Sequence, residues 1–310
     1  MIDYPAALAV ALVVQTGSFE KAAKALHVTP SAISQRVKMI EDRLGVSLIE
    51  RGSPCVATEK GEWLCRHMDH VGMLEKDLIK HMPGLAEAGD GPLHRVTLTL
   101  ATNADSLGTW FLGAVAPFAR STDFLVSIAV DDEDYTADWL HRGRVLAAVT
   151  SLAKPVKGCR VTRLGALRYQ ATASPEFFER YFARGVTPET LARAPALTFS
   201  QKDRLQRDWI RRTLGACVGF PTHWLPSTQG FVDACLAGMG WGMNPAQLVG
   251  GHLQAGRLVE ILPGRTLDSP LFWQVNRLAA DQLSDLTRAV VGQASRALIQ
   301  PSAESDPPEV

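Results

Sequence analysis

The sequence has few cysteines and no long apolar run, and both absences limit what the protein can be. Its five cysteines, at positions 55, 65, 159, 217 and 235, have no CxxC or zinc-finger spacing, so we expect free thiols in a reducing compartment. No apolar run reaches the length of a membrane span, and the apolar N-terminus is not preceded by a positive leader. We therefore expect a cytoplasmic protein with no membrane partner.

Motifs of catalysis and of cofactor binding are also missing. The chain has no GxSxG, HExxH or Walker loop, so we expect no enzyme and no cofactor. His67 and His70 are one helical turn apart but lack a third metal ligand nearby. Gly238, Gly240 and Gly242 precede Met-Asn-Pro instead of opening a helix after a strand, which argues against a nucleotide loop.

A surplus of positive charge is absent as well. Lysine plus arginine equals aspartate plus glutamate, at 32 each, and residues 1–66 carry eight basic against seven acidic side chains. Any affinity for nucleic acid must then come from a local patch. With 310 residues, 46% of them hydrophobic, the chain is long enough for two or three domains with true cores.

Residues 18–44 have the pattern of two short amphipathic helices joined by a tight turn. Ser18 is a good N-cap for the first helix, and Thr29 with Pro30 is a good start for the second. Apolar residues recur at helical spacing in both segments. The predicted core stripes are Phe19, Ala22, Ala23 and Leu26 in the first helix, and Ile33, Val37, Ile40 and Leu44 in the second.

The outward face of the second helix carries side chains that suit DNA bases and phosphates. Short hydroxyls can approach base edges, glutamine suits adenine, and lysine and arginine reach phosphate or guanine. The alternative is the polar face of an ordinary three-helix bundle. Residues 46–61 favour DNA binding, because they have the pattern of a wing with Arg51 before a Gly-Ser-Pro turn. The predicted DNA-binding residues are Thr29, Pro30, Ser31, Ser34, Gln35, Arg36, Lys38 and Arg51.

These motifs resemble those of the LysR-type transcriptional regulators. The similar patterns are Ser18-Phe-x-x-Ala-Ala-x-x-Leu, Val28-Thr-Pro-Ser-Ala-Ile-Ser, Leu44-Gly and Thr58-x-x-Gly61. Further segments, at 101–112, 164–169, 227–231 and 238–245, resemble the branch that senses basic amino acids, the LysG/ArgP type. The similarity extends from about residue 5 to residue 298. Two positions depart from the pattern: Val56, where the wing commonly has arginine, and Gln229, where the branch commonly has glutamate.

The resemblance implies an α/β protein with an N-terminal winged helix-turn-helix, a long dimerisation helix and a two-lobed, periplasmic-binding-protein-like effector domain. It also implies double-stranded operator DNA, RNA polymerase and lysine or arginine as partners, a homodimer or homotetramer, and control of a basic amino acid exporter gene. A solute-binding protein would share the two lobes but would need an export signal and no reader of DNA. The expected domains are 1–60, 61–93, 94–300 (lobe 1 at about 94–165 and 266–300, lobe 2 at about 166–265) and a disordered tail at 301–310.

One long helix is predicted between Thr58 and Met82. Leu64, Val71 and Leu78 are seven residues apart, with Leu74 between them, as in the seam of a dimerisation helix. Pro83, Gly84 and the Gly-rich stretch up to residue 92 should end the helix and supply a hinge.

From about His94, strands and helices alternate, as in doubly wound α/β lobes. A strand through Val96 and Leu100 leads into TNADSLGTW, where the start of a helix can attract a carboxylate. A second strand ends in the acidic run 131–134, although both acidic features have an ordinary explanation: Asp105 can cap a helix and the run can be a solvated loop.

For a basic amino acid we predict two halves of a site at these strand ends. Asn103, Ser106 and Thr109 would lie near the carboxylate, while Asp105 and one or two of Asp131, Asp132 and Glu133 would meet positive charge. Trp110 would form a wall of the pocket. In the second lobe, Thr228, as N-cap beside Gln229, would face the ligand.

Overall fold

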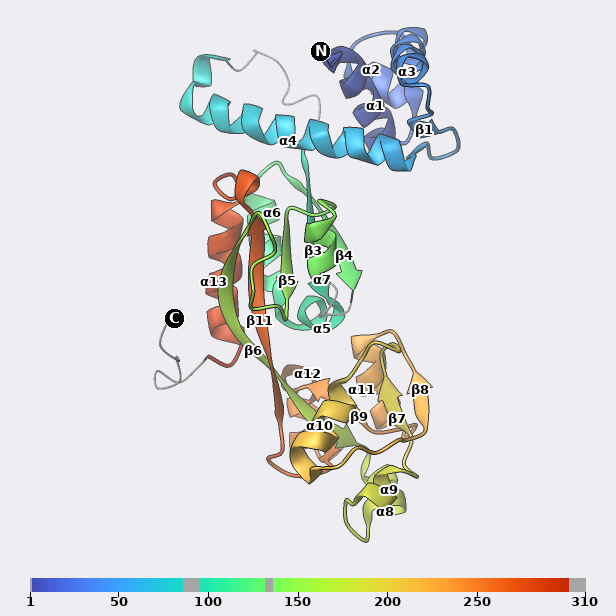
Figure 1. Cartoon of the computed structure of the whole chain (residues 1–310), viewed down its shortest axis with the longest axis vertical. Coiled ribbons are helices and arrows are strands. Elements are labelled where there is room, and N and C mark those ends of the chain that lie inside the picture. The colour runs from blue at the N-terminus through green and yellow to red at the C-terminus, as the bar shows by residue number, and fades with distance from the viewer. Residues whose placement is uncertain (1, 86–94, 132–135, 301–310) are drawn as a thin grey trace. The chain divides into compact units, whose positions relative to one another are not determined.

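The computed structural model describes residues 2–85, 95–131 and 136–300 of the chain (Figure 1). Its contacts divide it into two compact units, Met1–Leu98 with Ser121–Ser127, and Thr99–Arg120 with Ile128–Val310. Asp132, Glu133 and Asp134 lie outside the described residues, as do most of the predicted hinge and the tail at 301–310.

The first unit begins with three short helices that pack around one apolar core. The predicted caps are confirmed: the Ser18 side chain accepts from the Lys21 N–H, and Thr29 accepts from the Ala32 N–H, with Pro30 opening the next helix. Ile33, Val37 and Ile40 are buried as predicted, but Leu44 is 53% exposed. Leu44 is the last residue of its helix, before the Gly45 C-cap, so the core stripe ends one turn earlier. The helices are α1 (Tyr4–Thr16), α2 (Phe19–Ala25) and α3 (Pro30–Leu44).

A two-stranded wing and a long helix complete this unit. The strands β1 (Ile49–Glu50) and β2 (Val56–Ala57) pair antiparallel. The long helix α4 (Glu59–His81) begins at the Thr58 cap, which accepts from the Gly61 N–H, and η1 (Pro83–Leu85) follows it. This confirms the predicted long helix.

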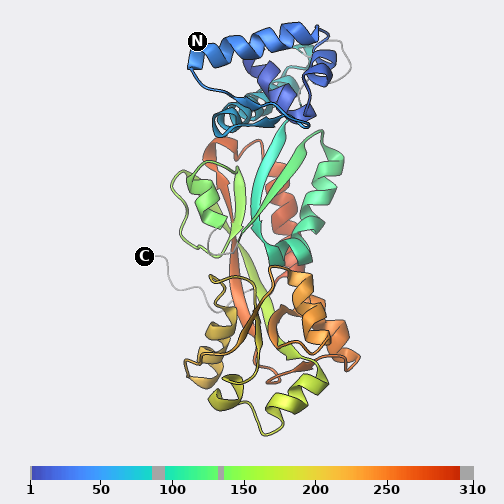
Figure 2. The same ribbon diagram turned by 90° about the vertical axis from the view of Figure 1, so that its right-hand side faces the viewer.

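The second unit is organised by a mixed sheet with the order β10-β6-β11-β5-β3-β4, and β9 also pairs with β6. The two long central strands, β6 (Cys159–Ala173) and β11 (Leu267–Asn276), are antiparallel neighbours. Figures 1 and 2 show that these two strands continue from one lobe of the unit into the other. The lobes are therefore joined by a pair of strands that hydrogen-bond to each other.

The first lobe contains two parallel strands. Strands β3 (Thr97–Asn103) and β5 (Ala147–Thr150) are parallel, and every residue of β5 is buried because helices cover both faces of the sheet. A mixed sheet replaces the purely parallel arrangement that is typical of doubly wound domains. The other elements of this lobe are α5 (Ala104–Ser106), η2 (Leu107–Phe111), α6 (Leu112–Ser121), β4 (Leu125–Asp131), α7 (Thr136–His141), η3 (Arg277–Ala279) and α13 (Ser284–Ala297).

The second lobe packs helices around the far ends of the crossing strands and a small parallel sheet, β7 with β8. Its core includes Trp209 and Trp241, both fully buried with ring centroids 5.6 Å apart. The elements are α8 (Pro175–Phe182), α9 (Pro188–Leu191), β7 (Ala196–Thr198), α10 (Leu205–Leu214), β8 (Thr222–Trp224), α11 (Thr228–Leu236), β9 (Gly242–Pro245), α12 (Ala246–Gln254) and β10 (Val259–Glu260).

All five cysteines are free, and four of them are buried or half-buried. Within the described residues, no group of three or more His, Cys, Asp or Glu side chains is placed to hold a metal ion. The same residues include no helix that is both long and apolar enough to cross a membrane.

Candidate functional site

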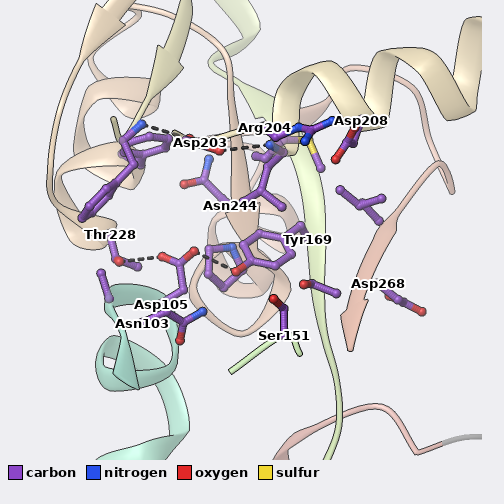
Figure 3. Close-up of a pocket in the computed structure, with 18 of the residues that line it drawn as sticks. Asn103, Asp105, Ser151, Tyr169, Asp203, Arg204, Asp208, Thr228, Asn244 and Asp268 are labelled. Carbon is purple, nitrogen blue, oxygen red and sulfur yellow. Dashed lines mark hydrogen bonds between the residues drawn. The ribbon is translucent and has the colours of Figure 1, made fainter. Parts of the chain in front are cut away.

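A cavity of about 310 Å³ lies in the second unit, between its two lobes (Figure 3). The first lobe contributes the ends of β3 and β4 and the residue after β5, the second contributes the loop before α10, and the crossing strands contribute Tyr169 and residues 267–270. This volume is within the range of small-molecule sites. The polar residues that line it are Asn103, Asp105, Asp131, Ser151, Tyr169, Asp203, Arg204, Asp208, Arg212, Thr228, Asn244, Asp268 and Ser269.

The carboxylate of Asp105 is held from two sides by hydroxyl groups. The Tyr169 hydroxyl donates to its Oδ2 at 2.8 Å, and the Thr228 hydroxyl donates to its Oδ1 at 2.6 Å (Figure 3). Burial raises the pKa of Asp105, the nearby charge of Asp203 adds to that rise, and the two hydroxyl bonds oppose it. Neither donor is charged, so the hydroxyl groups that hold the Asp105 carboxyl group bring no positive charge to it.

The cavity has an excess of negative charge. Five aspartates and two arginines line it within the described residues. Two of these aspartates are in ion pairs with residues outside the lining: Asp208 with Arg211 at 2.8 Å, and Asp268 with Arg168 at 2.7 Å. A third, Asp131, accepts a hydrogen bond from the Trp139 indole at 3.1 Å. The arrangement suits a ligand that carries more positive than negative charge.

Asp203 is a cavity residue that the sequence did not predict. Its carboxylate accepts the backbone N–H groups of Phe199 at 2.9 Å and Leu205 at 3.0 Å, and the Gln206 amide at 3.4 Å. Burial raises the pKa of this carboxyl, while these hydrogen bonds and the charge of Arg207 oppose the rise. Like Asp105, it is held mainly by neutral donors.

The residues predicted on the carboxylate side do not all reach the cavity. Asn103 lines it, but its Oδ1 caps the following turn by accepting the Ser106 N–H at 3.0 Å. Ser106 is buried outside the lining, and the Thr109 hydroxyl donates to the Asp105 backbone carbonyl. Trp110 is 1% exposed and packs edge-on against Phe111, so it lies in the lobe core and not in the cavity wall.

The second-lobe prediction is corrected in its capping detail. Ser227 is the N-cap of α11, accepting the Gly230 N–H, and this frees the Thr228 hydroxyl to reach Asp105. Gln229 is exposed, its amide donates to Asp233 at 3.2 Å, and it does not line the cavity. Of the predicted acidic run, Asp131 lines the cavity, while Asp132 and Glu133 lie outside the described residues.

The predicted DNA-binding face lies on α3 and the wing. Pro30, Gln35 and Lys38 are exposed, and Ser34 and Arg36 are half-buried. The Thr29 and Ser31 hydroxyls are 2.9 Å apart at the start of α3. The Arg51 guanidinium lies 5.1 Å from the centre of the Phe19 ring, which holds the wing against α2.

Two family models match this chain over most of its length. The model described as a bacterial regulatory helix-turn-helix protein of the lysR family matches residues 8–62, and the LysR substrate binding domain matches residues 93–298. The chain belongs to the LysR family. The helix-turn-helix predicted between Ser18 and Leu44 is the DNA-binding motif of these regulators.

Relatives place this LysR-family chain in the ArgP/LysG branch, which confirms the resemblance seen in the sequence. It is 39% identical to the HTH-type transcriptional regulator ArgP of Pseudomonas aeruginosa over 302 residues, which is 97% of this chain and 99% of the relative. LysG from Corynebacterium glutamicum, solved with bound effector Arg, is 34% identical with a TM-score of 0.63, over 97% of this chain and 100% of that one. These relatives are regulators of transcription, and the LysR-family chain is not an enzyme.

A third relative covers a smaller share of this chain at higher identity. The C-terminal domains of a LysR family protein from Agrobacterium tumefaciens are 67% identical, with a TM-score of 0.66, over 67% of this chain and 100% of that structure. The α/β fold, with an N-terminal helix-turn-helix and a LysR substrate-binding domain, is therefore shown for this LysR-family chain.

Proposed function

We propose that this regulator responds to lysine or arginine bound in the cavity around Asp105. The observation that carries the proposal is the Asp105 carboxylate itself, which lines the cavity and is oriented by two neutral hydroxyls. Desolvating a carboxylate is costly unless a cation joins it. A ligand ammonium or guanidinium group would remove that cost, whereas a neutral or acidic ligand would not.

The relatives and the lining agree with a basic effector. The LysG structure contains Arg as its effector, and the cavity has three more acidic than basic side chains among the described residues. The departure at Gln229 does not alter the lining, because that side chain is exposed and bonded to Asp233. A basic effector is therefore compatible with glutamine at this position.

The proposed mechanism links this site to DNA. Two chains pair through α4 and place two α3 helices in successive major grooves of an imperfect palindrome, where Ser31, Ser34 and Gln35 meet bases and Lys38 and Arg51 meet phosphates. The effector domain acts as a periplasmic-binding-protein-like pair of lobes. The effector can change the arrangement of the two α3 helices only if it binds one arrangement of the protein more tightly than the other.

The wider role that we propose follows from the branch. The regulator would act in the cytoplasm, as a dimer or a pair of dimers, on the gene of a basic amino acid exporter through contact with RNA polymerase. The domain limits proposed for this action are 1–60 for DNA binding, 61–93 for dimerisation and hinge, and 94–300 for the effector.

The test is the thermal stability of the purified chain against all the common amino acids. A ligand at about a hundred times its Kd adds roughly 2.7 kcal/mol to the folded state. We expect stabilisation by lysine or arginine alone, loss of that response in Asp105→Asn, and retention of operator binding without effector. Asp285→Asn, which removes an exposed ion pair with Arg288 on α13, is the control. A response only to neutral or acidic amino acids, or an unchanged response in Asp105→Asn, would refute the proposal.

A further inference from the structure

Two carboxylates of the cavity are held by neutral donors and paired with no cation in the described structure. Asp105 accepts two hydroxyls, and Asp203 accepts two backbone N–H groups and an amide. In contrast, Asp208 and Asp268 have their own arginine partners. A ligand with two cationic centres therefore meets two carboxylates that are available to it, one from each lobe.

A second observation that points to a ligand is the side-chain oxygen of Asn244, a cavity residue, which has no hydrogen-bond donor among the described residues. Asn244 is fully buried, and its amide nitrogen donates to the Thr172 hydroxyl at 2.9 Å, which fixes the orientation of the group. Its Oδ1 is buried and has no hydrogen-bond partner among the described residues. Figure 3 draws Asn244 between Asp203 and Asp105 in that view. A buried acceptor without a donor is unfavourable, so a ligand N–H at this point would be stabilising.

The cationic side chains of the lining lie on one side only. Arg204 and Arg212 both belong to the second lobe, at the start and near the end of α10, and the first lobe contributes no described arginine or lysine to the cavity. Arg204 directly follows Asp203 in the chain. Both residues line the cavity, and a carboxylate and a guanidinium from one lobe match the head group of an amino acid, in which an ammonium and a carboxylate share one carbon atom.

We propose that the effector's α-ammonium binds Asp203 and the Asn244 Oδ1, its α-carboxylate binds Arg204, and its side-chain cation binds Asp105. This inference rests on the proposed function and adds an orientation and a ligand class to it. The second lobe binds the complete head group of the amino acid, and the first lobe binds the cation of its side chain. Amines without the carboxylate, and amino acids without the second cation, fit only part of it.

This orientation keeps Asp105 against positive charge, as predicted from the sequence, but it moves the ligand carboxylate away from Asn103, Ser106 and Thr109, where the sequence prediction placed it. The structure supports the change, because Ser106 and Thr109 do not line the cavity and the Asn103 Oδ1 is an acceptor that caps its own turn. The Asp105 carboxylate would also repel a ligand carboxylate at that end.

The test pairs each substitution with a ligand that lacks the matching group, with Kd measured calorimetrically on the full-length chain. Agmatine lacks the carboxylate of arginine, Nα-acetylarginine lacks the α-ammonium, and citrulline lacks the side-chain charge. A hydrogen bond to a charged group contributes about 1.5–3 kcal/mol, so each matched loss should be roughly tenfold to a hundredfold.

We expect Arg204→Gln to weaken the binding of arginine by that factor and to change the binding of agmatine little. Asp203→Asn should weaken the binding of arginine but not that of Nα-acetylarginine. Asp105→Asn should weaken the binding of arginine but not that of citrulline. Asp285→Asn, in an exposed ion pair on α13 outside the cavity lining, is the control, and Arg212→Gln tests the other arginine of the lining. A variant that only distorts the cavity would weaken the full ligand and the truncated ligand equally, which separates damage from recognition.

Three results would overturn this orientation while leaving the proposed function intact. In the first, Asp203→Asn and Arg204→Gln both bind arginine with wild-type affinity. In the second, these variants bind the full and the truncated ligands equally weakly. In the third, Arg212→Gln instead of Arg204→Gln weakens the binding of arginine but not that of agmatine. If the wild-type chain binds neither lysine nor arginine, the proposed function fails and the orientation fails with it.

Discussion

At the scale of single residues, Asp69 of α4 binds the backbone of Thr97, within the first unit. Its carboxylate accepts the Thr97 N–H at 2.9 Å, next to Val96, which packs against Gly72 of the same helix. Burial raises the pKa of Asp69 from 3.8 to about 6. The native state therefore holds this proton more tightly than an unfolded chain does.

The sign of the resulting pH dependence follows from linkage. The contribution of Asp69 to stability is fully present below about pH 4 and is lost as the pH rises to about 6, by at most about 3 kcal/mol. Asp69→Asn keeps an oxygen for the Thr97 N–H and removes the desolvated charge. We expect it to be more stable than wild type at pH 7.5, with little difference at pH 4, in urea unfolding at both values.

The control for this prediction is Glu75→Gln, an exposed carboxylate on the same helix. It should leave the stability difference between the two pH values as in wild type. If Asp69→Asn is instead less stable than wild type at pH 7.5, the carboxylate charge stabilises the helix and our reasoning is wrong.

Also at the residue scale, variants of Gln35 and Lys38 test the proposed base reading and the proposed phosphate binding separately. Both are exposed on α3. Gln35→Ala should lose about 1–3 kcal/mol on the operator and little on random DNA, since a base contact is specific. Lys38→Ala should weaken both DNAs and reduce the salt dependence of binding. Titrations of labelled duplexes at several salt concentrations would show the difference, and equal losses on both DNAs for Gln35→Ala would exclude base reading by that residue.

At the scale of elements, the junction of the wing with α4 depends on Gly61. A Cβ built at this position would lie 2.0 Å from the Leu48 carbonyl oxygen, so either the helix or the wing must move to accept one. We expect Gly61→Ala to lower the free energy of unfolding by about 1–3 kcal/mol and to weaken DNA binding. Differential scanning calorimetry measures the first effect.

Gly250→Ala provides the matched substitution on another helix, because nothing lies within 4 Å of a Cβ at that position of α12. Alanine in a helix interior is favoured over glycine by about 1 kcal/mol, so this variant should be equal to or more stable than wild type. If Gly61→Ala melts at the wild-type temperature, the close approach of α4 to the wing does not limit stability.

Elements with local signals could be predicted from the sequence, and contacts between distant segments could not. The caps at Ser18 and Thr29 were predicted because a capping side chain and its helix are adjacent in the chain. Asp105 was predicted as a site residue from the resemblance to the family at residues 101–112, because its strand-to-helix junction alone also fits an ordinary helix cap. Thr228 was misassigned as a cap because its neighbour Ser227 fits the same pattern, and only the fold shows which hydroxyl points toward Asp105.

The missed cavity residues have no local signature. Tyr169 belongs to a motif shared with the family, but nothing near it in the sequence indicates a hydrogen bond to a residue 64 positions away. Asp203 lies in a polar loop that resembles any surface turn. Both reach the cavity only because β6 and β11 cross between the lobes and bring the second lobe over the ends of β3 and β4.

At the scale of the whole molecule, α4 carries exposed apolar side chains that one chain alone leaves in water. Leu74 is 58% exposed and Leu78 is 49% exposed, at positions that the heptad pattern assigns to a seam. Trp63 and Met82, near the two ends of α4, are 54% and 53% exposed. Apolar surface of this kind on a helix is typical of an interface, and for this family we propose a second copy of the chain.

Replacing both seam leucines by glutamate should therefore separate the copies. Full burial of a leucine contributes about 1.5–3 kcal/mol, and a symmetric pair would lose four such side chains and gain four charges that repel across the interface. We expect Leu74→Glu/Leu78→Glu to sediment as a monomer at micromolar concentration and to bind a two-half-site operator no better than a single half-site. Leu278→Glu, which alters a leucine that is 88% exposed in η3, should remain dimeric. A double variant with wild-type mass would place the dimer contact elsewhere. A dimer that carries two helix-turn-helix units should bind two half-sites with much higher affinity than one half-site. If the variant is a monomer but binds the operator with wild-type affinity, each helix-turn-helix unit binds its half-site alone.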